Sequence, residues 1–186
     1  GEIVGILRDV ARALAYAHGQ GVVHRDIKPD NVLLSAGSAT VTDFGIAKAI
    51  NAARGTDGGH RTELTIAGTS IGTPTYMAPE QAAGDPETDH RADLYAYGAM
   101  AYEMLAGHPP FHGLTPSKLL AAHMGERPKD VRSLRSDCPE ALAALVMQCL
   151  EKEPAARPDG AAAIARVLET ITSSGAATAA PAILAG

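Results

Sequence analysis

The sequence lacks several features that mark particular classes of protein. Its 186 residues include two cysteines, Cys138 and Cys149, which are too few and too plainly spaced for a disulfide framework or a zinc site. No apolar run reaches the roughly 18 to 20 residues of a membrane span, and no signal peptide opens the chain. Basic residues never cluster and the formal net charge is -5, which disfavours a nucleic-acid partner. We expect a reducing, cytoplasmic compartment and no membrane segment within this chain.

The chain is long enough for one domain with a sizeable core, and its hydrophobic share of 46% is ordinary for a globular protein. Apolar residues recur every three to four positions from Ile3 to His18, which predicts a helix closed by Gly19 and Gly21. The same spacing predicts further helices at 92–105, 116–124, 142–150 and 164–171. Cys149 lies on one of these apolar stripes, so we expect a buried, inert thiol. Short β-branched segments predict small strands at 22–23, 32–34 and 40–42.

Two segments lose this periodicity. Residues 47–70 are rich in glycine, threonine and charge, and a loop of this length inside a compact domain is usually functional. After Thr172 the Ser/Gly/Ala/Thr/Pro composition is typical of a flexible tail. We therefore predict a mainly α domain over residues 1–172, with short strands around one central loop, and a flexible tail or linker over 173–186.

Three motifs follow one another along the chain. His-Arg-Asp-Ile-Lys-Pro-Asp-Asn occupies residues 24–31, Asp-Phe-Gly occupies 43–45, and Gly-Thr-Pro-Thr-Tyr-Met-Ala-Pro-Glu-Gln occupies 72–81. Each is weak alone: His-Arg-Asp is a common surface tripeptide, and an Asp followed by Gly is common turn chemistry. In this order and spacing they make the chain resemble the eukaryotic-like protein kinases, most of all the bacterial branch, with the serine/threonine form of the catalytic loop. The resemblance covers residues 1–172, the larger C-terminal lobe.

The resemblance implies ATP and Mg²⁺ and gives roles to individual residues. Asp26 would accept the proton of the substrate hydroxyl, and Lys28 would neutralise charge on the transferred phosphate. Asn31 and Asp43 offer the oxygen donors that magnesium prefers. Lys28, Asn31 and Asp43 would contact ATP, with Leu33 as the apolar contact under its base. Phe44 would pack beneath the site and fix the direction of Asp43.

Other positions match scaffold and substrate roles of the same family. Glu80 and Arg157 correspond to a buried ion pair between the end of the activation segment and the later helices. Asp93 matches the acid at the start of the central helix that hydrogen-bonds the catalytic-loop backbone. Thr73 matches the residue that contacts Asp26 and Lys28 and favours serine and threonine substrates.

Regulation by phosphate is also implied. Arg25, directly before Asp26, marks the kinases in which a phosphate on the activation loop pairs with that arginine. The candidate phosphosites are Thr65, Thr69 and Ser70, and Thr65 is preferred because it matches the first threonine of a Thr-x-Thr pair found in many bacterial relatives. Ala67 replaces the second.

No G-x-G-x-x-G loop, V-A-I-K-type lysine or partner glutamate occurs before His24. We therefore expect that the β-rich N-terminal lobe is absent, that the chain is a fragment of a longer kinase, and that the fragment is inactive alone. The partners implied are ATP and protein substrates. The resemblance allows a homodimer for activation-loop autophosphorylation and a cytoplasmic position within a membrane-anchored kinase.

Two other functions fit parts of this sequence. A non-catalytic kinase-like interaction module could bind partners through the surface after Thr115, but it would have no need for all four of Asp26, Lys28, Asn31 and Asp43. A small-molecule phosphotransferase of related fold is disfavoured, because Lys28 and the Ala-Pro-Glu segment at 78–80 belong to the protein-kinase pattern.

Overall fold

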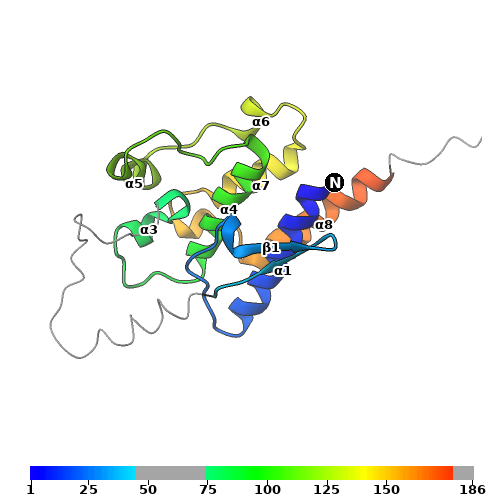
Figure 1. Ribbon diagram of the computed structural model, residues 1–186, viewed down its shortest axis with the longest axis horizontal. Coiled ribbons are helices and arrows are strands. Elements are labelled where there is room, and N and C mark those ends of the chain that lie inside the picture. Colours follow the sequence, from blue (N-terminus) through cyan, green and yellow to red (C-terminus); the bar gives the residue numbers. More distant parts are fainter. Residues whose placement is uncertain (45–73, 178–186) are drawn as a thin grey trace, which may run out of the picture.

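The computed structural model describes residues 1–44 and 74–177, with side chains described as far as residue 171 (Figure 1). It is mainly helical, which confirms the predicted fold class. The longer helices are α1 (Glu2–Gly19), α4 (Arg91–Ala106), α5 (Pro116–Gly125), α7 (Glu140–Cys149) and α8 (Ala161–Ala177). Shorter turns of helix are η1 (Pro29–Asn31), η2 (Pro74–Tyr76), α3 (Pro79–Ala82), α6 (Val131–Leu134) and η3 (Pro154–Ala156). Within the described ranges, no helix is long and apolar enough to cross a membrane.

Helix α1 buries the apolar stripe that the sequence predicts. Leu7, Val10 and Leu14 are fully buried, and the helix packs against α8 and the β-hairpin (Figure 1). At its end, Gly21 takes the left-handed φ of 73° that favours glycine. The N–H of Val22 then donates to the carbonyl of Ala17 at 2.9 Å, which closes the last turn of the helix.

The strand predicted at 22–23 is therefore wrong for the part of the chain that the structure describes. The backbone of Val22 is committed to the end of α1, and its side chain is exposed. The described sheet consists of β1 (Val32–Ser35) and β2 (Ser38–Val41), which pair antiparallel. Ala36 and Gly37 join them, and both have positive φ. Positive φ at both positions lets a two-residue hairpin turn match the twist of its two strands. The hairpin follows the motif at 24–31 directly and fixes the C-terminal end of that motif.

Helix α4 lies at the centre of the fold (Figure 1). Every residue from Ala92 to Tyr102 is buried, as expected for a helix that other elements cover on all sides. At Gly98 an added Cβ would come within 2.6 Å of the Cβ of Cys149, so α4 and α7 approach closely only because this position is glycine. Cys149 is fully buried, and burial raises the pKa of its thiol to about 12. The predicted burial of this thiol is confirmed.

Of the C-terminal helices, α5 begins where the sequence indicates, and α7 and α8 begin two and three residues before their predicted starts at 142 and 164. Pro116 opens α5 after Thr115, although the Thr115 side chain makes no capping hydrogen bond. Helix α8 runs past Thr172 to Ala177, so the start of the tail predicted at 173 falls inside a helix. Alanine and serine sustain helical geometry when the preceding turns are already anchored. Residues 178–186 lie outside the described residues.

Candidate active site

The carboxylate of Asp93, on α4, holds the loop at residues 24–31 by its backbone. The Asp93 carboxylate is 1% exposed and accepts the backbone N–H of His24 at 2.8 Å and that of Arg25 at 2.7 Å. Arg25 has a positive φ of 65°, a conformation that costs a non-glycine residue free energy unless its surroundings fix it. The two carboxylate bonds supply that constraint, so the loop is built onto a rigid helix.

His24 and Phe44 form the base of the site. His24 is fully buried, and its Nε2 lies 2.9 Å from the carbonyl oxygen of Thr42. Its Nδ1 accepts the backbone N–H of Asp26 at 3.3 Å. These partners assign the neutral tautomer with its proton on Nε2. The Phe44 ring packs on the imidazole, with ring centroids 4.7 Å apart, so the two motifs of which these residues are part meet here.

Asp26, Lys28 and Asn31 converge on one face of the loop. Lys28 Nζ lies 3.0 Å from Asp26 Oδ2. Asn31 is buried, and its amide nitrogen donates to the Asp26 carbonyl at 2.7 Å and to Asp26 Oδ2 at 3.3 Å. These bonds orient the Asp26 carboxylate between a cation and an amide, and they leave the Asn31 amide oxygen as the atom able to bind a cation.

Asp43 follows β2 and is exposed, with a positive φ of 56°. Leu33 on β1 is also exposed, at 57%. The structure thus brings the side chains of Asp26, Lys28 and Asn31 together, and it leaves Asp43 and Leu33 exposed. Thr65, Thr69, Ser70 and Thr73 lie outside the described residues. In the ranges that the structure describes, no three histidine, cysteine or acidic side chains gather as a preformed metal cluster.

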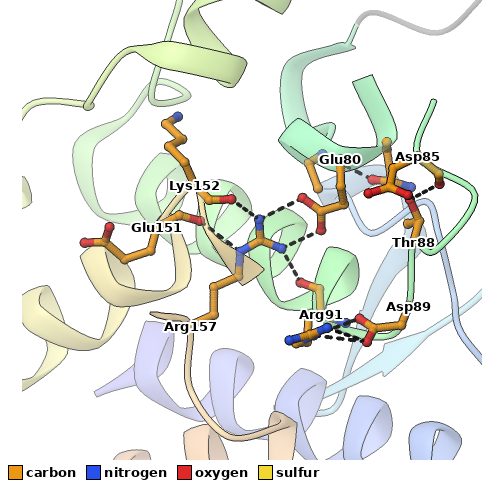
Figure 2. Close-up of polar contacts among 10 residues, drawn as sticks. Glu80, Asp85, Thr88, Asp89, Arg91, Glu151, Lys152 and Arg157 are labelled. Atoms are coloured by element: carbon orange, nitrogen blue, oxygen red, sulfur yellow. Dashed lines mark hydrogen bonds and ion pairs between the residues drawn. The ribbon is translucent and has the colours of Figure 1, made fainter. Parts of the chain in front are cut away.

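Arg157 binds both oxygens of the Glu80 carboxylate (Figure 2). Its remaining N–H groups donate to the carbonyls of Arg91, Glu151 and Lys152, at 2.8, 2.9 and 3.0 Å. All five guanidinium donors therefore have acceptors. The Arg157 side chain is 0% exposed and that of Glu80 10%, so this pair ties α3 to α4 and to the segment before α8.

A second polar cluster continues from Arg157 to α5. The guanidinium lies 5.1 Å from the Tyr95 ring, and the Tyr95 hydroxyl lies 2.9 Å from Nδ1 of the buried His123. Lys152 Nζ donates to the same hydroxyl at 3.1 Å. Burial, with the Lys152 charge, lowers the pKa of His123 to about 4. Burial, with the Arg157 charge, lowers the pKa of Lys152 to about 8.

Two residues that the sequence did not single out for the site help to hold the loop, and a third, Tyr76, bonds to α4. His18, at the end of α1, donates from Nε2 to Asp93 Oδ2 at 2.9 Å. Gln81 Nε2 lies 3.4 Å from the Arg25 carbonyl. The Tyr76 hydroxyl donates to Glu103 Oε2 at 2.5 Å, and burial, then this carboxylate, raises the pKa of Tyr76. The one signal in the sequence is that Tyr76 and Gln81 lie within the third motif.

Comparison with known proteins gives the class. The sequence-family model described as the protein kinase domain matches residues 1–168. The chain is 39% identical over 178 residues to the serine/threonine-protein kinase pkn3 of Myxococcus xanthus, covering 92% of this chain and 31% of that protein. It is 39% identical over 160 residues to the serine/threonine-protein kinase PknB of Mycobacterium tuberculosis, covering 86% of this chain and 24% of that protein.

A third relative is the DNA damage-responsive serine/threonine-protein kinase RqkA of Deinococcus radiodurans, 40% identical over 158 residues, or 84% of this chain and 22% of that protein. The chain belongs to the protein kinase domain family, which confirms the family inferred from the three motifs. It spans between 22% and 31% of the length of these curated relatives.

Proposed function

We propose that this chain supplies the catalytic lobe of an enzyme that transfers the γ-phosphate of ATP to serine and threonine hydroxyls of proteins. The observation that carries the proposal is the convergence of Asp26, Lys28 and Asn31 on one face of a loop held by a buried carboxylate. Phosphoryl transfer needs little covalent chemistry from the protein; it needs positioning, charge neutralisation and a proton acceptor. This constellation can supply each of these.

Asp26 is the proton acceptor in this account. Its carboxylate takes the proton of the substrate hydroxyl while the hydroxyl oxygen attacks the γ-phosphorus. Asn31 and Lys28 hold the carboxylate from two sides, so little reorientation is needed when a substrate binds. Lys28 carries a positive charge 3.0 Å from Asp26 Oδ2, close enough to reach a phosphate oxygen near the attacked phosphorus.

The donor set fits magnesium. The Asn31 amide oxygen and the Asp43 carboxylate are hard oxygen ligands, and no thiol or imidazole is needed to complete the pair. When bound, the ion would neutralise charge on the phosphate oxygens. Asp43 and Asn31 would hold it, and the exposed Leu33 on β1 offers an apolar surface to the base of ATP.

Titration calorimetry of the full-length protein with ATP tests the nucleotide site. We expect Asp43→Ala to remove the magnesium-dependent part of the affinity and to leave stability nearly unchanged, because Asp43 is exposed. The same titration without magnesium is the control. If Asp43→Ala bound ATP as tightly as the parent at saturating magnesium, Asp43 would not be a ligand.

The same loop supports a proposal on regulation. We propose that a phosphate on Thr65 pairs with Arg25, whose backbone Asp93 fixes directly beside the proton acceptor. A phosphate adds nearly two negative charges and can make about one to three charge-assisted hydrogen bonds, which suffices to order a segment. Thr69 and Ser70 are the alternative sites. Thr73 is proposed to contact Asp26 and Lys28 and to favour serine and threonine substrates.

A further inference from the structure

The connection between α4 and α5 carries two histidines whose rings stack. The ring centroids of His108 and His112 lie 3.9 Å apart, with planes at 40°. His112 is exposed and His108 is half-buried beside Tyr102, whose ring centroid lies 6.1 Å from that of His108. Neither imidazole belongs to the active site described above, and neither is needed to fill the core.

The tautomer of His108 is set by its neighbour. Its Nδ1 lies 2.9 Å from the carbonyl oxygen of Pro109. A carbonyl can only accept, so Nδ1 carries the proton and Nε2 of the neutral ring presents a lone pair. Histidines that bind metals usually hold the other ring nitrogen in this way, which fixes the ring and increases its basicity.

The loop that carries the pair is constrained at both ends. Gly107 closes α4 with a left-handed φ of 81°, and two prolines follow His108. Phe111, directly before His112, is buried in a small cluster with Leu119 and Ala122 of α5. Because Gly107, the two prolines and Phe111 fix the backbone between the pair, the two imidazoles stay close without a bound ligand, and binding requires only a side-chain rotation of His112.

A second pair of histidine rings serves as a comparison for the availability of ring nitrogens. His18 and His90 lie 5.2 Å apart. Nε2 of His18 is committed to Asp93, and its Nδ1 is buried. That pair cannot offer two nitrogens to a solvent ion, whereas in the pair at 108 and 112 His112 is exposed and only Nδ1 of His108 is committed to a carbonyl.

We propose that His108 and His112 form a surface site for a divalent transition-metal ion. Imidazole suits Cu²⁺, Ni²⁺ and Zn²⁺, and affinity among these should be highest for Cu²⁺. Within the described ranges no third histidine, cysteine or acidic residue completes a cluster, so the two imidazoles are the ligands that the described residues supply. Two imidazoles bound at about 2.0–2.1 Å need ring centres further apart than in the stack. His112, being exposed, swings outward, and binding unstacks the rings.

Titration calorimetry of the untagged full-length protein with CuCl₂ and ZnCl₂, in a non-chelating buffer containing magnesium, tests this site. The variants His108→Phe and His112→Phe keep an aromatic ring in the stack but remove the ligand nitrogens. Each should weaken binding about tenfold or more, while His90→Gln should not. Paramagnetic broadening by Cu²⁺ in an NMR spectrum should fall on residues 107–113.

Two results would overturn the proposal: affinity unchanged in both phenylalanine variants, or broadening located away from this loop. Absence of binding at millimolar Zn²⁺ and Cu²⁺ would do the same. Binding of Mg-ATP, measured on the same variants, should be unchanged. Failure of the parent protein to bind Mg-ATP would count against the proposed kinase function and not against the histidine site.

Discussion

The guanidinium of Arg157 and the carboxylate of Glu80 are joined at two points, 2.6 Å from Nη1 to Oε1 and 2.8 Å from Nη2 to Oε2. The two residues are far apart in the sequence, and neither side chain is appreciably exposed. A buried charge is tolerated only when it is paired and fully hydrogen-bonded. The stability of the end of the third motif and that of the segment before α8 therefore depend on one and the same ion pair.

Glu80→Gln should destabilise the protein by about 3–5 kcal/mol, because it strands the Arg157 charge among backbone carbonyls. The matched control is Arg91→Met, which breaks the ion pair of Arg91 with Asp89, whose two side chains are 39% and 41% exposed. Exposed pairs contribute about 0–1 kcal/mol. Urea unfolding of the two variants makes the comparison. Equal losses for both would show that the buried pair has no special role.

Stability between pH 8 and pH 10.5 should report on Lys152. Its pKa in the folded protein is about 8, against an ordinary value of 10.5. Through that window the unfolded chain binds more protons than the folded protein, so this group adds stability as the pH rises. Tyrosines and cysteines with raised pKa values act in the opposite sense above about pH 9.

The difference between the parent and Lys152→Met isolates this contribution. The free energy of unfolding of the parent, relative to the variant, should increase from pH 7.5 to pH 10. The exposed Lys118, changed to methionine, controls for the loss of one positive charge. A difference that is flat with pH, or that falls, would contradict the lowered pKa of Lys152.

Thr65 carries the regulatory proposal. Mass spectrometry of the active full-length protein should find phosphate on Thr65, and Thr65→Ala should lower activity more than Thr62→Ala. If phosphate on Thr65 acts through Arg25, Arg25→Ala should have a similar effect and the double variant should add nothing. Full activity of Thr65→Ala would end this part of the account, whatever the result for Thr69 or Ser70.

The sequence predicts the helices of this fold well, because periodic apolar residues such as Leu7, Val10 and Leu14 face one core. The residues at 22–23 show the limit of pattern reasoning. Two valines favour a strand, but the local closure of α1 takes the Val22 N–H. The end of α8 was missed for a similar reason, since alanine and serine are compatible with both helix and tail.

The candidate site also has a part that the sequence predicts and a part that it does not. Its motif residues could be named from order and spacing, because phosphoryl transfer restricts which side chains can serve. The supporting contacts could not. His18 bonds to Asp93 across 75 positions of sequence, and Tyr76 bonds to Glu103 from the end of the short helical turn η2. Such pairs depend on how helices pack, and a local pattern carries no information on that.

If Asp26 accepts the substrate proton, the rate of phosphate transfer depends on its carboxylate. The measurement is the kcat of the full-length protein with radiolabelled ATP and a saturating protein substrate. Asp26→Asn should lower kcat by about 10²–10⁴-fold. Asp30→Asn removes a neighbouring, exposed carboxylate of the same loop and should change kcat by no more than a few-fold. A kcat for Asp26→Asn within a few-fold of the parent would contradict the account.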